Sequence, residues 1–406
     1  MRRCPNKVLR RRAVRASTKD LNLNGEAFGR AKYEATSRTR DDPKTSFNQS
    51  TVVDAGVVEA GAKSLIFYPV DPISDPRWRH FIEHDARATV FHTPGWLLTL
   101  RETYGYEAVV HTTSAPSEPV ANGVVFCRVK SWFTGSRLVS LPFSDHCEPL
   151  IGPGEDAGEF ANLSDSNRWR YVELRPVTAI PNGTHCQGGF QESENFWLHR
   201  LDLSPTSAEL FRHFHTDCVR RKIRKAEKEH VACEEGNNPA LLESFYRLLL
   251  RTRRRHGLPP QPKKWFRNLS KYLTEHIKIR VASKDGQPIA SILTFSYKGK
   301  LMYKYGCSDE RYHRFGGMQL LLWRAIEEAK ENNYSEFDLG RCEWENSGLR
   351  IFKDRWGASR SKLTYWRYQP GRLSFAREHR MVRRALHLCP PSLLQIAGRS
   401  LYRHIG

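Results

Sequence analysis

The fold is decided by Leu301-Met302-Tyr303-Lys304-Tyr305-Gly306 and the segments that follow it, which are Phe315-Gly316-Gly317, residues 318–333, Phe337-Asp338-Leu339-Gly340-Arg341 and Phe352-Lys353-Asp354-Arg355-Trp356-Gly357. In order, these segments read as a strand, a glycine turn, a helix, a second strand and a second helix. Glycines at a helix start leave its first backbone N–H groups accessible. Together with the macrodipole, these groups favour binding of a phosphate or carbonyl oxygen at that end. Two glycines alone are common at helix starts, so the prediction depends on the whole ordered string.

The residues before this stretch predict helices followed by a meander of strands. Ser204-Pro205-Thr206 combines a hydroxyl cap with a proline in the first turn, which is typical of a helix start and marks a boundary between two halves. Apolar side chains share one face of 318–333, so this helix is expected to pack on the sheet. The other expected helices of this half are 208–230, 241–256 and 262–275, and its strands are 277–282, 289–297, 301–305 and 364–368.

The first half shows a similar order of elements. Helices are expected over 76–87 and 94–104, and strands over 64–68, 107–111, 120–129, 137–141, 169–174 and 196–203. The loop from Pro142 to Pro149 is dense in polar groups. The shared order suggests an internal duplication. The expected organisation is a disordered basic leader (1–63), an N-terminal domain (64–203), a C-terminal domain (204–370) and a basic amphipathic tail (371–406).

Composition favours a two-domain cytoplasmic protein. The chain has 406 residues, of which 39% are hydrophobic and 11% aromatic, so it can build a sizeable core. No run approaches the roughly 18 uncharged apolar residues of a membrane span. Nine cysteines are scattered singly and sixteen histidines show no metal-ligand spacing, which favours reduced thiols and no metal site. Cys307 and Cys342 flank the glycine turn, where packing is favoured over catalysis.

The formal net charge of +21 predicts a polyanionic partner or an anionic surface. Nucleic acid, anionic lipid and phosphate-rich substrates all fit this charge. The alternative for any single basic block is an ordinary solvated surface.

The second half offers residues for acyl transfer to an amine. That reaction polarises a carbonyl, removes a proton from the amine and holds the leaving group. Amides at Gly316 and Gly317 could hold phosphate with Arg314, while Lys353 could stabilise an oxyanion. The candidates for accepting the proton are Asp338, Glu343 and Glu345.

Each of these residues has a purely structural alternative. Tyr303 and Tyr305 alternate on one strand, so at least one of them could be core. Asp338 could pair with Arg341 or Lys353. The two glutamates could be solvated loop residues.

The motif string resembles the C-terminal half of the FemAB-like branch of GNAT acyltransferases. The matching segments are Tyr305-Gly306-Cys307-Ser308-Asp309, Tyr312, Gly316, the long helix, Phe337-Asp338-Leu339-Gly340-Arg341, Gly348-Leu349-Arg350-Ile351-Phe352-Lys353 and Trp356-Gly357. Leu141-Pro142-Phe143-Ser144-Asp145 and Pro94-Gly95-Trp96 similarly resemble the N-terminal half. The resemblance covers roughly residues 64–370.

This resemblance implies an α/β (α+β) fold of tandem GNAT-like domains, with mixed sheets flanked by helices and a cleft between the halves. Lys353 falls on the Phe-Lys pair that Fem-type enzymes place near the transferred acyl group. Gly316 and Gly317, with Arg314 and Met318, correspond to the turn that binds the coenzyme A pyrophosphate, although here the glycine pattern is degenerate. A coiled-coil arm like that of some Fem enzymes is also missing from the sequence.

We therefore expect an N-acyltransferase that moves an acetyl or other acyl group from a donor such as acyl-CoA (acetyl-CoA) to an amine of a cell-envelope or polysaccharide precursor. The enzymatic alternative uses aminoacyl-tRNA to build a peptidoglycan interpeptide bridge. The non-enzymatic alternative is a basic binding module. The predicted catalytic residues are Lys353, Tyr305 and Asp338, the donor-binding residues are Arg314, Gly316, Gly317 and Met318, and the substrate-binding residues are Ser144, Asp145, Arg341, Glu343 and Trp356.

The tail supports a separate expectation. Apolar and arginine residues alternate between Phe375 and Leu388 as in a basic amphipathic helix. Peripheral contact with the inner face of the membrane is one interpretation, and packing of the tail back onto the core is the other.

Overall fold

The computed structural model describes residues 66–132, 135–161, 169–178, 189–369 and 402–404. The expectations for the leader (1–63) and for most of the tail (371–406) lie outside the described residues. No helix in the described part is both long and apolar enough to cross a membrane.

The first half alternates short helices with a strand meander. Its elements are β1 (Tyr68–Val70), α1 (Pro76–His84), a 3-10 turn (Val90–His92), α2 (Pro94–Tyr104), β2 (Glu107–Thr112), β3 (Val124–Val129), β4 (Arg137–Val139), α3 (Ala157–Ala161), β5 (Val172–Leu174) and β6 (Gln191–Asp202). Helix α2 shows why the sequence predicted it well. Thr93 caps it by accepting a hydrogen bond from the Trp96 amide, Pro94 occupies its first turn, and Gly105 ends it in the left-handed conformation.

The second half repeats this order around a longer helix. Its elements are α4 (Ser207–His213), a π-helical turn (Thr216–Arg220), α5 (Arg221–Lys228), β7 (Ala232–Gly236), α6 (Pro239–Arg255), α7 (Lys263–Tyr272), β8 (Ile277–Lys284), β9 (Gln287–Tyr297), β10 (Lys300–Ser308), a 3-10 turn (Glu310–Phe315), α8 (Gly317–Glu331), β11 (Glu336–Glu343), α9 (Ser347–Asp354) and β12 (Ser359–Tyr368). The helix expected over 208–230 is broken at Phe214 and His215, and strand β7 was not predicted.

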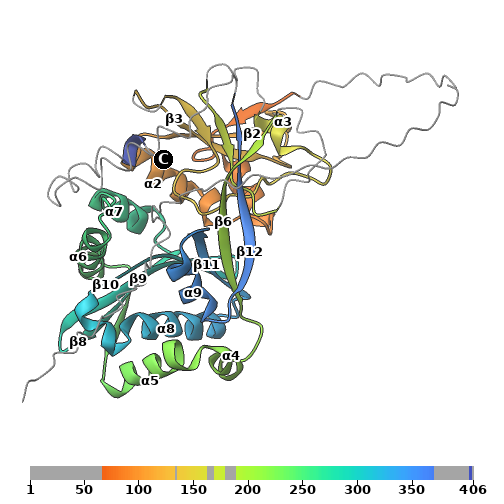
Figure 1. Cartoon of the computed structure of the whole chain (residues 1–406). Coiled ribbons are helices and arrows are strands. Elements are labelled where there is room, and N and C mark those ends of the chain that lie inside the picture. Colours follow the sequence, from red (N-terminus) through yellow and green to blue (C-terminus); the bar gives the residue numbers. More distant parts are fainter. Residues whose placement is uncertain (1–65, 133–134, 162–168, 179–188, 370–401, 405–406) are drawn as a thin grey trace, which may run out of the picture.

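The twelve strands of the described residues form one mixed sheet in the order β1-β2-β3-β4-β5-β12-β6-β11-β10-β9-β8-β7. Each half contributes an antiparallel meander and one parallel pair, which is β4–β5 in the first half and β10–β11 in the second. The last strand of each half pairs with the other half, because β6 pairs with β11 and β12 pairs with β5. Strands β6 and β12 run side by side between the halves (Figure 1). The sheet is therefore continuous across the predicted domain boundary.

The parallel pairing of β10 with β11 in the second half ends after three residue pairs. Strand β10 pairs with β11 only over Lys300–Met302 and Glu336–Asp338. Just beyond, the register of β10 against its other neighbour, β9, shifts between Tyr303 and Tyr305. The register of β11 against β6 shifts between Asp338 and Arg341. Because a bulge redirects the side chains after it, Tyr303 and Tyr305 enter different cores. Lys304 and Gly340 lie at these two irregularities.

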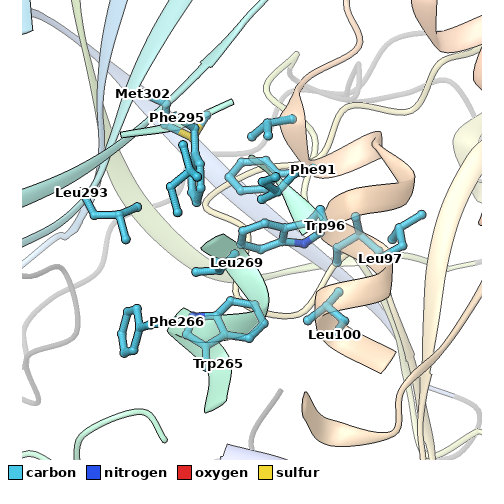
Figure 2. Close-up of a cluster of buried hydrophobic side chains, with 14 of the residues drawn as sticks. Phe91, Trp96, Leu97, Leu100, Trp265, Phe266, Leu269, Leu293, Phe295 and Met302 are labelled. Carbon is cyan, nitrogen blue, oxygen red and sulfur yellow. The ribbon is translucent and has the colours of Figure 1, made fainter. Parts of the chain in front are cut away.

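The largest core joins the two halves. Trp96 of α2 and Trp265 of α7 lie edge to face with ring centroids 5.4 Å apart, and Phe295 of β9 meets Trp96 at 5.9 Å. Figure 2 shows these rings together with Phe91 and Leu269. Tyr402 is buried in the same core and donates a hydrogen bond to the Pro259 carbonyl, so the described end of the tail packs on the body of the protein.

We expect Trp96→Ala to lower the free energy of unfolding by about 3–5 kcal/mol, because it leaves a cavity between the halves. Chemical denaturation followed by circular dichroism would measure the loss. Trp132→Ala is the matched control, since Trp132 is 88% exposed and its removal should change stability by no more than about 0.5 kcal/mol. Similar losses for both variants would contradict the assignment of Trp96 to a cross-half core.

Candidate functional site

The loop after β4 inserts an acidic side chain into the opening between β10 and β11. Asp145 Oδ1 accepts a hydrogen bond from Lys304 Nζ at 2.7 Å, and Arg341 Nε lies 3.9 Å from the same oxygen. Burial alone would raise the pKa of Asp145, but Lys304 and Arg341 outweigh it and lower the pKa to about 2. Asp145 is therefore a carboxylate that links the first half to two strands of the second.

The next residue makes a second link. His146 Nε2 lies 2.8 Å from Asp338 Oδ2, and both side chains are almost completely buried. The other oxygen of Asp338 accepts the Gly340 amide at 2.7 Å. Burial would raise the pKa of Asp338, but the hydrogen bond from His146 and the nearby charge of Arg200 favour the carboxylate, and the pKa is lowered. Asp338 is thus ionised and oriented by partners on both oxygens.

The inserted loop is held by Arg175, which directly follows β5, and by Tyr365 of β12. Arg175 donates to the carbonyls of Leu141 and Ser144 at 2.6 and 3.2 Å, and pairs with Glu173 at 2.7 Å. The Tyr365 hydroxyl donates to the Asp145 carbonyl at 2.6 Å. Because β12 comes from the second half, both halves fix the loop.

Gly340 makes room for the carboxylate. Its φ is 74°, in the left-handed region, and a Cβ there would lie 2.6 Å from Asp145 Oδ2. A residue other than glycine would therefore be strained and would also displace Asp145.

Lys353 lies on the other side of the β11 irregularity. Its Nζ donates to the carbonyls of Gly340 and Arg341, each at 2.8 Å, and the residue is 2% exposed. Burial lowers its pKa to about 8, although nearby Cys342, Asp145 and Asp338 favour the charged form. With two donors used among the described residues, the third can meet an incoming oxygen.

Two predicted site residues, Tyr305 and Trp356, lie in hydrophobic cores rather than in this cluster. The Tyr305 hydroxyl accepts from Trp265 Nε1 at 3.0 Å inside the cross-half core. Trp356 is fully buried against Phe214, with ring centroids 5.0 Å apart. Ser144 is buried and donates to the Leu141 carbonyl, whereas Glu343 is half-buried at the end of β11.

The glycine turn is closely packed. A Cβ on Gly316 would lie 2.3 Å from the Lys222 carbonyl of α5, and one on Gly317 would lie 3.0 Å from Ile289. Gly316, Gly317 and Met318 are buried, while Arg314 is exposed over the Phe315 ring. Close packing accounts for both glycines, and donor binding at this turn stays a prediction.

Sequence reasoning missed two members of the cluster. His146 lies in the polar loop noted above, but it meets Asp338 across 192 residues, and no local pattern reports such a contact. Lys304 was quoted as part of a strand, but only the bulge turns it toward Asp145. Among the described residues, no group of three or more histidine, cysteine or acidic side chains could hold a metal ion.

Comparison with known families identifies the second half. Residues 215–354 match the family model described as an acetyltransferase (GNAT) domain. These residues form a GNAT-type domain. The matched segment contains Lys304, Asp338, Gly340 and Lys353, whereas Asp145 and His146 come from outside it.

Solved structures agree on the fold. FemX is 14% identical, with a TM-score of 0.58, over 76% of this chain and 97% of its own. A tandem GNAT protein from the clavulanic acid biosynthesis pathway is 12% identical, with a TM-score of 0.47, over 76% and 99%. L-PGS from Bacillus licheniformis is 15% identical, with a TM-score of 0.46, over 82% and 97%. A search of curated sequences finds no significant match. The fold shared with FemX agrees with the predicted α/β architecture of a mixed sheet flanked by helices.

Gly340→Ala should destabilise the protein more than Gly286→Ala. Both glycines have a φ near 75°, so each alanine costs about 1–2 kcal/mol from backbone strain. Only at position 340 would the new Cβ also displace a buried carboxylate, since Gly286 has nothing within 4 Å. Denaturant titration of both variants measures the difference, and equal losses would show that Asp145 is not held against Gly340.

The stability of the protein should depend on Lys353 in a defined pH window. The folded-state pKa of about 8 lies below the ordinary value of 10.5, so between these values the unfolded chain binds more protons. The free energy of unfolding should therefore rise from pH 8 to pH 10.5, relative to Lys353→Met, by about 3 kcal/mol at most. A difference that falls with pH in this window would contradict the buried ammonium.

Proposed function

We propose that the protein is an N-acyltransferase that moves an acetyl or other acyl group from an activated donor, acyl-CoA, to an amine of a cell-envelope or polysaccharide precursor. The observation that carries this proposal is the buried Lys353 ammonium, fixed by two β11 carbonyls beside a cluster of carboxylates from both halves. The match of the surrounding residues to a GNAT domain supports the reaction class.

Lys353 would act on the acyl carbonyl. When an amine attacks a thioester or ester, negative charge develops on the carbonyl oxygen. A fixed N–H donor in a dry site stabilises that charge without reorganisation, and removal of one such donor typically lowers kcat by about 10²–10³. The third N–H of Lys353 would make this contact, and the two hydrogen bonds to β11 carbonyls would hold the side chain still.

Carboxylates would bind the acceptor amine and assist in removing its proton. Asp338 is a buried carboxylate, and Asp145 lies beside it with Lys304 and Arg341 as counter-charges. An acceptor ammonium entering this region would find negative charge on Asp145 and Asp338. We assign acceptor binding to Asp145 and Arg341, and assistance in proton removal to Asp338.

A second donor class is favoured by one observation. The start of α8 is closely packed against α5 at Gly316, where a coenzyme A pyrophosphate would be expected. This packing favours an aminoacyl-tRNA donor and a peptidoglycan interpeptide acceptor as the second candidate. Exposed basic residues on α5, such as Arg221, Arg224 and Lys225, would suit its phosphate backbone.

The donor can be tested directly. Purified protein is incubated with radiolabelled acetyl-CoA or with radiolabelled aminoacyl-tRNA, each with a panel of amine-bearing envelope precursors. We expect label in the acceptor from one donor only, and a drop of about 10²–10³ in kcat for Lys353→Met. The Trp132→Ala protein serves as a folded control with wild-type turnover.

Two results would count against the proposal. Full turnover by a folded Lys353→Met protein would remove Lys353 from the mechanism. Salt-sensitive binding of RNA without transfer from either donor would instead support the basic binding module.

A further inference from the structure

The tautomer of His146 follows from its partner. Asp338 is ionised and its Oδ2 can only accept a hydrogen bond, so His146 Nε2 must carry the proton that it donates across 2.8 Å. In the neutral ring, Nδ1 is then an unprotonated acceptor. This atom is buried and has no hydrogen-bond partner among the described residues.

The lack of a partner for Nδ1 among the described residues distinguishes His146 from its buried neighbour His92. His92 Nδ1 accepts the Thr89 amide at 3.0 Å, and its Nε2 lies 3.0 Å from the Glu148 carbonyl. Both nitrogens of His92 are thus used for structure. A buried acceptor without a partner costs about 1–3 kcal/mol, so a water or substrate group that donated to Nδ1 would be stabilised there.

Charged and titratable groups from several elements surround His146. Asp338 on β11 faces Nε2, and Asp145 is its chain neighbour. The other titratable or charged groups packed around the pair are Lys304 on β10, Arg341 on β11, Lys353 on α9, Arg200 on β6 and His92. The Phe91 ring closes one side, with its centroid 5.8 Å from that of His146. A carboxylate partner stabilises the imidazolium once it forms.

We propose that His146 is the general base of acyl transfer, accepting the proton of the acceptor amine at Nδ1 through one bridging water, while Asp338 orients the ring. This inference rests on the proposed N-acyltransferase function. It assigns the proton to a residue from the first half, outside the segment that matches the GNAT domain.

In acyl transfer through His146, one proton moves from the amine to the leaving atom. The amine nitrogen attacks the acyl carbon, a C–N bond forms, and the nitrogen's excess proton passes through the water to Nδ1. The tetrahedral intermediate then collapses and the bond from carbon to the leaving sulfur or oxygen breaks. The His146 imidazolium returns its proton, by the same route, to that leaving atom. The products are an amide and a neutral thiol or alcohol, and no oxidant or metal is consumed.

His146→Gln is the sharpest variant. The glutamine amide nitrogen can replace Nε2 as the donor to Asp338, so the link between the halves is kept while the basic Nδ1 is lost. We expect kcat/KM to fall by about 10²–10⁴ with the donor that the wild-type protein uses, and its dependence on pH at the acid side to disappear. His111→Gln is the control, because His111 lies on β2, contacts the Phe160 carbonyl of α3 and is outside the cluster.

A measurement without substrate separates this inference from the proposed function. Nitrogen-15 NMR of histidine-labelled protein should show neutral His146 protonated at Nε2 and bare at Nδ1, and Asp338→Asn should shift this signal. A proton on Nδ1 would overturn the inference whatever the donor is. Unchanged kcat/KM and pH profile in His146→Gln would also overturn it, leaving the N-acyltransferase intact. Absence of transfer by the wild-type protein, with the expected tautomer present, would instead reject the N-acyltransferase and with it the role of His146 as its base.

Discussion

The site depends on the insertion of one loop of the first half into the opening between β10 and β11. Asp145 meets Lys304, and His146 meets Asp338, all with little exposed surface. Buried charges are tolerated only with partners in good geometry, because each loses its hydration. Without the loop, Lys304 would lose its ion pair with Asp145, and Asp338 would lose its contact with His146. The two halves are thus coupled by charge as well as by the aromatic core.

The exchange of last strands explains how this contact is kept in register. Strand β6 leaves the first half to pair with β11, and β12 leaves the second half to pair with β5. Strand β12 then brings Tyr365 to the carbonyl of Asp145, while β6 pairs with the part of β11 that carries Asp338. The backbone that holds each end of the insertion therefore belongs to one continuous sheet (Figure 1).

Local signals in the sequence predicted the elements, and long-range geometry decided the site. The helix expected over 94–104 matches α2, where Thr93 and Pro94 form the cap, and the strands expected over 277–282 and 289–297 match β8 and β9, because caps, turns and local periodicity act within a few residues. The period of a strand could not show that Tyr303 and Tyr305 enter different cores, since a bulge at Lys304 breaks the alternation. The exchanged strands and the pairing of His146 with Asp338 span many residues and leave no local pattern. Lys353 was named from the sequence as a possible oxyanion donor and again through the resemblance, but its two carbonyl partners became visible only in the structure.

The glycines of the motif string serve two different physical purposes. At Gly316 the missing side chain lets α8 approach the α5 backbone, and at Gly340 it admits a carboxylate from the other half. Both positions have a positive φ, so the sequence alone cannot distinguish them. The difference matters for the chemistry of the site. Because Gly340 leaves space for the Asp145 carboxylate, it allows that negative charge to lie near Lys353. Asp145 and Asp338 favour the charged form of Lys353 from this position, while burial opposes it. That balance keeps the pKa of the ammonium near neutral pH, where a lysine can be charged during the reaction and still lie in a dry site.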